Sequence, residues 1–148
     1  MTTRKSDDIE FLSIRDLANG LDQGIFTSSD LVKHFSTKIS LEDKDFNSIA
    51  FLNPQAEEIA KEMDEERRKG RVRSALHGIP LVVKDNIDTA DEMMTSAGSL
   101  ALDGSKAQRD AHLVSRLRAG GAIILGKSNL SEWANFRSTR SCSGWSSR

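Results

Sequence analysis

Hydrophobic residues recur every three or four positions along residues 13–70, and this spacing predicts helices joined by short turns. Two of these helices have a clear start. Ser13 is followed three positions later by Asp16, and Thr27 by Asp30, which is the capping-box pattern. Each helix then presents apolar residues on one side: Ile14, Leu17, Ala18 and Leu21 in the first, and Leu31, Val32, Phe35 and Ile39 in the second.

A third helix is predicted after Asn53 and Pro54, which suit a helix cap and a first helical turn, and it ends at Gly70. Its two sides differ in character. One side is apolar (Ala56, Ile59, Ala60, Met63), and the other carries the charged residues Glu57, Glu58, Glu62, Glu65, Glu66, Arg67, Arg68 and Lys69. A charged side of this kind is typical of a solvated helix face.

The pattern changes after the third helix. Residues 79–83 (IPLVV) form a continuous apolar run, which predicts a strand buried on both faces. Asp110 suits the cap of a helix that ends at Gly120, and residues 122–125 (AIIL) predict a second buried strand. A strand, a long connection containing a helix and another strand are typical of an α/β unit with a parallel pair.

Two strands are too few for a sheet that covers its own edges. We therefore expect an incomplete α/β fold, with N-terminal helices followed by the first strands of a mixed central sheet. In this interpretation residues 1–148 are the N-terminal portion of a single domain. That portion comprises a helical part (1–70), part of the α/β core (71–136) and a serine-rich loop (137–148).

The composition fits one domain with an aliphatic core, because 37% of the 148 residues are hydrophobic but only 5% are aromatic. The 21 Lys and Arg nearly balance the 22 Asp and Glu, leaving a net charge of −1. This balance gives no electrostatic reason to expect nucleic acid or an anionic membrane as a partner. The oligomeric state is left open.

No apolar run approaches the roughly 20 residues that span a bilayer, and the N-terminus lacks the apolar segment of a cleaved signal peptide. Cys142 is the single cysteine, so no internal disulfide is possible. We therefore expect a cytoplasmic location with no membrane partner.

Residues 121–128 (GAIILGKS) match the string of a phosphate-binding P-loop, with Lys127 as its lysine. That loop needs a strand before it and a helix after it. Here a helix is predicted before Gly121, and the apolar residues inside the string favour a strand. A nucleotide-binding function is therefore the weakest of the hypotheses considered.

Several distinctive blocks follow one another along the chain: LHGIPLVVKDNIDT (76–89) and TSAGS (95–99), then DAHLV (110–114) and LRAGGA (117–122), then GKSNLSEWANFR (126–137). Together, in this order, they strongly resemble the amidase signature family. The similarity runs from about Ser13 to Arg148. It implies an amidase-signature fold and the hydrolysis of a small-molecule carboxylic amide, without a metal or an organic cofactor.

The resemblance implies a Ser-Ser-Lys mechanism, in which a lysine activates a nucleophilic serine through a bridging serine, and Lys84 matches that lysine. Serine needs such a base at neutral pH, and the leaving amine needs a proton. The family's two serines are expected downstream of residues 144–148 (GWSSR), so we expect the chain to be truncated and inactive alone. A noncatalytic, partner-binding module derived from an amidase is the alternative.

Other residues are weaker candidates. Asp85 could pair with Lys84, but neighbouring strand side chains point to opposite faces, which favours a structural role. Ser146 and Ser147 belong to the segment before the catalytic serines, and Cys142 has no adjacent base. The remaining candidates are His34, His77 and His112, which lack metal-ligand spacing, and Trp133 and Trp145, for which packing is favoured over a substrate cleft.

Overall fold

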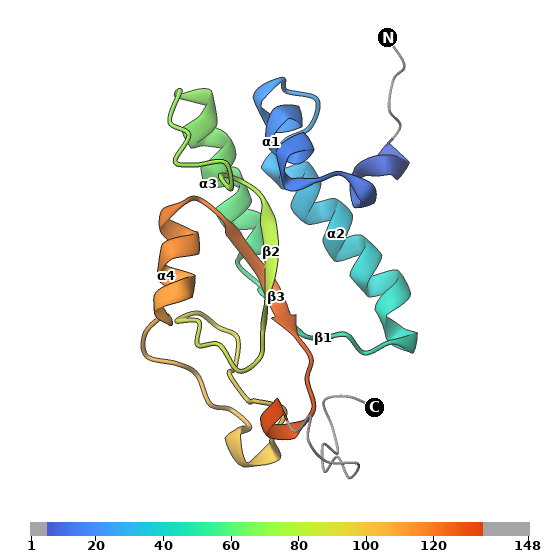
Figure 1. Ribbon diagram of the computed structural model, residues 1–148, viewed down its shortest axis with the longest axis vertical. Coiled ribbons are helices and arrows are strands. Elements are labelled where there is room, and N and C mark those ends of the chain that lie inside the picture. The colour runs from blue at the N-terminus through green and yellow to red at the C-terminus, as the bar shows by residue number, and fades with distance from the viewer. Residues whose placement is uncertain (1–5, 135–148) are drawn as a thin grey trace.

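The computed structural model describes residues 6–134 (Figure 1). Its helices are α1 (Ile14–Asp22), α2 (Ser28–Glu42), α3 (Ala56–Arg68) and α4 (His112–Ala119), and its strands are β1 (Ile49–Leu52), β2 (Pro80–Lys84) and β3 (Ile123–Ser128). Short 3-10 helices cover Ser6–Phe11, Asp43–Asp45, Leu100–Leu102 and Glu132–Ala134. The expected α/β fold, with helices before most of a mixed sheet, is confirmed.

The two capping boxes form as the sequence predicts. The Ser13 hydroxyl accepts from the Asp16 backbone N–H at 3.2 Å, and the Thr27 hydroxyl accepts from that of Asp30 at 3.0 Å. In each box the carboxylate accepts in return from the cap residue's N–H. The first turns of α1 and α2 are therefore fixed by local chemistry.

The predicted caps of α3 and α4 are wrong. Asn53 is buried and uses its side-chain amide to donate to the Ile124 carbonyl at 2.8 Å, so Gln55 is the cap residue of α3. Asp110 accepts from the Ala90 N–H at 2.7 Å, and α4 begins one residue later than a cap at that position requires. In both cases the side chain also bonds a distant segment, although the Asn53 side-chain oxygen still accepts from the Gln55 N–H at 3.0 Å.

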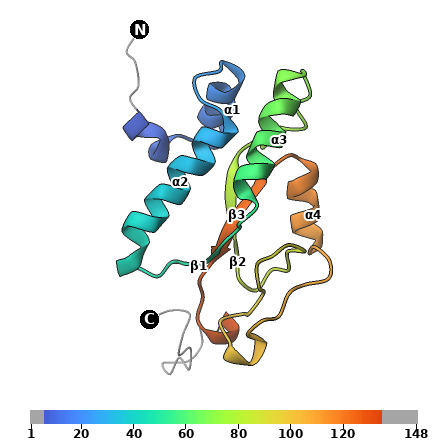
Figure 2. The same ribbon diagram turned by 180° about the vertical axis from the view of Figure 1, so that it is seen from behind.

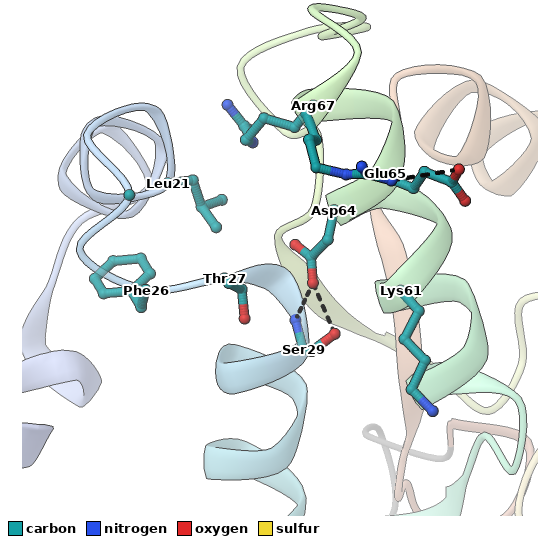
Figure 3. Close-up of a pocket in the computed structure, with 10 residues that line it drawn as sticks. Leu21, Phe26, Thr27, Ser29, Lys61, Asp64, Glu65 and Arg67 are labelled. Atoms are coloured by element: carbon teal, nitrogen blue, oxygen red, sulfur yellow. Dashed lines mark hydrogen bonds and ion pairs between the residues drawn. The ribbon is translucent and has the colours of Figure 1, made fainter.

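The α2 and α3 helices are joined at one end by Asp64 of α3 (Figure 3). Its carboxylate accepts from the backbone N–H of Ser28 at 2.6 Å and of Ser29 at 3.0 Å, and from the Ser29 hydroxyl at 2.7 Å. These are the free N–H groups of the first turn of α2. Asp64 therefore supplies, from another helix, the cap that the local sequence leaves incomplete.

β1 lies within residues 1–70, where the sequence analysis expected only helices. This four-residue strand runs antiparallel to β3, with Leu52 opposite Gly126 and Ile49 opposite Ser128. Gly126 has no room for a side chain, because a Cβ there would lie 2.5 Å from the Phe51 carbonyl oxygen. The strand is thus defined by its partner rather than by its own short sequence.

The sheet order is β1-β3-β2, and β2 pairs with β3 in parallel, as predicted. Leu81 lies opposite Ile124 and Val82 opposite Gly126, so Leu125 is an extra residue in β3. This β-bulge changes the face to which the following side chains point. β3 also continues three residues beyond the predicted strand end.

Helices cover both faces of the sheet, as the two opposite views show (Figures 1 and 2). Ile123 and Leu125 pack with α2 and α3, whereas Val83 and Ile124 pack with Val114 of α4. A further cluster joins the start of β2 to α1 and α2. Within residues 6–134, three small and mainly aliphatic clusters thus hold the sheet between its helices.

Candidate functional site

Lys84 is the last residue of β2 and its side chain is exposed. Its neighbour across the parallel pair is Ser128 at the end of β3. The ladder continues one step further, because the backbone N–H of Asp85 donates to the Ser128 carbonyl at 3.0 Å. The candidate base therefore stands at the carboxyl ends of two adjacent parallel strands, where α/β folds place their sites.

The sheet surface beside Lys84 is apolar and open. Val82, two residues earlier on the same face of β2, is 45% exposed, and Leu52 of β1 is 38% exposed. Both lie opposite Gly126, one on each side of it, so a glycine separates the two apolar side chains. Within residues 6–134, Lys84 thus borders a surface that offers apolar contact and no ion partner.

Asp85 points to the opposite face and is fully buried. Its carboxylate accepts from the Ser96 backbone N–H at 3.2 Å and from the Ser96 hydroxyl. Its carbonyl accepts from the Ala97 N–H at 2.9 Å. Asp85 therefore connects the end of β2 to residues 96–97 by hydrogen bonds, in agreement with the structural role predicted for it.

Lys127 is a buried charge that the sequence analysis did not assign to the site. Its side chain is 0% exposed, and its Nζ donates to the Ile87 carbonyl at 2.8 Å and to the Thr95 hydroxyl at 3.0 Å. Burial lowers the pKa of the ammonium, and the negative charges of Asp85, Asp91 and Asp88 oppose that shift.

Lys127 also decides the P-loop question. The matching string lies on β3, where a strand rather than a phosphate-binding loop carries it, and its lysine points into the protein interior. The nucleotide-binding interpretation is therefore not supported by the geometry. The burial of Lys127 could have been predicted from the apolar run before it, residues 122–125, which indicates a buried strand.

The histidines do not form a site. His77 is buried, with Nε2 3.0 Å from the Met63 carbonyl oxygen and Nδ1 accepting from the Arg73 N–H at 3.4 Å. His34 lies on α2 and His112 begins α4. Within the described part of the chain, no three metal-ligating side chains come together.

Trp133 differs from the expectation of ordinary packing, because its side chain is 61% exposed. Its backbone has a positive φ of 54° and its N–H donates to the Ala97 carbonyl at 2.8 Å. The other candidates from this end of the sequence, Cys142, Trp145, Ser146 and Ser147, lie outside the described residues.

A cavity of about 540 Å³ lies between the α1–α2 turn and α3 (Figure 3). It is lined by Leu21, Gly24, Phe26, Thr27, Ser29, Lys61, Asp64, Glu65, Arg67 and Arg68. Lys84 is not among these lining residues, and the Asp64 carboxylate already accepts hydrogen bonds from Ser28 and Ser29 at the start of α2. This cavity is therefore separate from the candidate site.

A search of protein-family models finds the family Amidase over residues 30–144, most of the chain. The chain belongs to the amidase family. The family match includes Lys84 and the block of residues after it, so the residues at the open end of β2 and β3 lie within the family region.

Solved structures of amidases resemble this chain closely. The native peptide amidase from Stenotrophomonas maltophilia is 49% identical with a TM-score of 0.84, over 90% of this chain and 28% of that chain. The complex of the peptide amidase with the competitive inhibitor chymostatin gives 48% identity and a TM-score of 0.86, over 95% of this chain and 29% of that chain.

Curated relatives extend the similarity. A protein of Schizosaccharomyces pombe named a putative amidase is 44% identical over 140 residues, which is 95% of this chain and 24% of the relative. A glutamyl-tRNA(Gln) amidotransferase subunit from Natranaerobius thermophilus is 38% identical, over 86% of this chain and 26% of its own length. The chain therefore spans about a quarter of the length of these relatives.

No helix in the described part of the chain is both long enough and apolar enough to cross a membrane.

Proposed function

We propose that the whole protein hydrolyses the C–N bond of a carboxylic amide by a Ser-Ser-Lys mechanism, with Lys84 as the general base and later the general acid. One observation carries this proposal. Lys84, the residue that matches the family's lysine, is exposed at the carboxyl end of β2, beside a surface that a further segment can cover.

In the proposed reaction the neutral Lys84 amine takes a proton from a bridging serine, which takes one from the nucleophilic serine. The serine oxygen attacks the amide carbonyl, the C–N bond breaks, and Lys84 returns a proton to the departing ammonia or amine. Water then hydrolyses the acyl-serine. No metal or organic cofactor takes part in these steps.

Lysine acts as a base only in its neutral form, which requires that its surroundings disfavour the ammonium. Apolar Val82 and Leu52 on the open face are suitable parts of such a surrounding. We propose that residues downstream of the GWSSR block (144–148) complete it and also supply both serines. The 148-residue chain alone is then inactive, because it has the base without the nucleophile.

The expected location is cytoplasmic, and the expected partner is a small-molecule amide rather than nucleic acid. The near-zero net charge of −1 supports the second statement.

A chimera tests the assignment. Residues 1–148 replace the matching quarter of the Stenotrophomonas maltophilia peptide amidase, and ammonia release from a peptide amide is measured. We expect the chimera to be active, and Lys84→Met to lower kcat by at least about 10²-fold, the lower range for loss of a general base.

Lys33→Met is the matched control, since Lys33 is an exposed lysine of α2 that is not among the residues of the candidate site. This variant should keep full activity. A folded chimera without activity would favour the noncatalytic partner-binding alternative. Activity that survives Lys84→Met would remove Lys84 from the mechanism.

A further inference from the structure

We propose that Lys127 is a positioning residue for Lys84. Its buried side chain holds the backbone turn that follows β2, and this turn sets the direction in which Lys84 leaves the sheet. The inference rests on the proposed function, because it concerns the same base. Lys127 does not touch the reacting atoms in this scheme.

The contacts form a short path between the two lysines. The Ile87 N–H donates to the Lys84 carbonyl at 2.9 Å, which closes a turn over residues 84–87. The Ile87 carbonyl accepts from Lys127 Nζ at 2.8 Å. The backbone of Ile87 is therefore bonded twice: its N–H to the Lys84 carbonyl, and its own carbonyl to the buried Lys127 ammonium.

Lys127 also binds the far end of the same loop. Its Nζ donates to the Thr95 hydroxyl at 3.0 Å, so one ammonium joins the beginning and the end of residues 87–95. The next residue, Ser96, is held by the Asp85 carboxylate. The loop is thus closed by two buried charged groups, one on each strand end.

The geometry separates the roles of the two lysines. Lys127 lies opposite Val83 and is 0% exposed, whereas Lys84 lies opposite Ser128 and is exposed on the other face. The Lys127 ammonium donates to two protein oxygens, so it is unsuited to reach a substrate. Burial and the cation of Arg118 lower the pKa of this ammonium, and the carboxylates of Asp85, Asp91 and Asp88 oppose that shift.

The charge at this point has a specific consequence. A hydrogen bond from an ammonium to a carbonyl is stronger than one between neutral groups, and it is directed by the fixed β3 backbone. If the turn relaxes, Lys84 moves relative to the serines that it serves. A displacement of about 1 Å at a reacting group costs roughly 10²-fold in rate.

Two variants of the chimera test the inference. Lys127→Met removes the ammonium, and Thr95→Val removes one of its acceptors while keeping the shape of the side chain. We expect kcat to fall about 10²-fold for Lys127→Met. Thr95→Val should lower kcat by about 3- to 10-fold, which corresponds to one ordinary hydrogen bond. Substrate KM and the inhibition constant of chymostatin should stay unchanged in both.

The pH profile gives a readout that folding alone would not move. In both variants Lys84 can leave the apolar surroundings proposed for it and become more solvated, which favours its protonated form. The acid limb of kcat/KM should therefore move to higher pH. Thr37→Val is the matched control, because Thr37 is an exposed threonine of α2, and it should change neither kcat nor the limb.

The outcomes separate this inference from the proposed function. If Lys84→Met abolishes activity while folded Lys127→Met and Thr95→Val keep the parent kcat and pH limb, Lys127 is only structural and the inference is overturned. If Lys84→Met stays active, the proposed function itself fails. If Lys127→Met does not fold, the kcat and pH limb of Thr95→Val decide.

Discussion

Replacing Asp64 by alanine should detach the first turn of α2 from α3. The carboxylate accepts three hydrogen bonds there, at 2.6 Å from Ser28 N, 3.0 Å from Ser29 N and 2.7 Å from the Ser29 hydroxyl. Figure 3 shows the two bonds from Ser29. In Asp64→Ala the two backbone donors at the start of α2 lose their partner. The Thr27 hydroxyl is oriented toward Asp30, since it accepts from the Asp30 N–H and donates to the Asp30 carboxylate at 2.7 Å.

The size of the effect follows from these contacts. A hydrogen bond to a charged group contributes about 1.5–3 kcal/mol, and loss of a helix cap costs about 0.5–2 kcal/mol. Asp64 is half-buried, so water replaces part of what is lost. We expect the free energy of unfolding to fall by about 2–3 kcal/mol for Asp64→Ala, and by about 1 kcal/mol for Ser29→Ala, which removes only the hydroxyl bond.

Urea denaturation followed by circular dichroism measures both variants and the double variant. The coupling energy between Asp64 and Ser29 should be about 1 kcal/mol, because the hydroxyl bond is lost only once. Asp45→Ala replaces an exposed aspartate and should change stability by less than about 0.5 kcal/mol. The reasoning is refuted if Asp64→Ala costs no more than Asp45→Ala, or if the two sites are additive.

Two further predictions concern the sheet and a helix cap. Gly126→Ala should lower stability by about 1–3 kcal/mol, because its Cβ would lie 2.5 Å from the Phe51 carbonyl oxygen, and an unchanged thermal midpoint would contradict this packing argument. Thr27→Ala should cost about 1 kcal/mol at neutral pH. The Thr27 N–H and hydroxyl donate to the Asp30 carboxylate and hold its pKa below the usual 3.8. The stability that the ionised carboxylate contributes is therefore present above pH 3.8, and it is lost as the pH falls through the lowered pKa of Asp30 in the folded protein. The difference in thermal midpoint between parent and Thr27→Ala should therefore narrow below pH 3.8, and a constant difference would contradict the assignment.

Local sequence patterns were sufficient to predict the structure where hydrogen-bond partners lie only a few residues apart in the sequence. Ser13 with Asp16, and Thr27 with Asp30, form their capping boxes without help from other segments. The apolar run before Lys84 predicts the strand, and its parallel partner follows from the helical connection between them. The position of Lys84 at a strand end was thus accessible from sequence and family resemblance.

Long-range contacts account for what the sequence did not reveal. β1 is too short to be recognised without its partner strand β3. Asn53 and Asp110 have the side chains of helix caps, but each is bound by a segment distant in sequence. Lys127 matched a familiar loop motif, and only the pairing of β3 shows that its ammonium is enclosed.

The extra residue Leu125 determines the face of the sheet to which Lys127 points. Leu125 packs toward α2 and α3, and the bulge then turns Lys127, two positions later, toward Ile87 and Thr95 on the other side. A strand that kept Leu125 but alternated regularly would point Lys127 to the same face as Leu125 and direct the ammonium into the aliphatic layer beneath the helices. The bulge therefore lets one short strand supply Leu125 to that layer and a buried lysine to the opposite face.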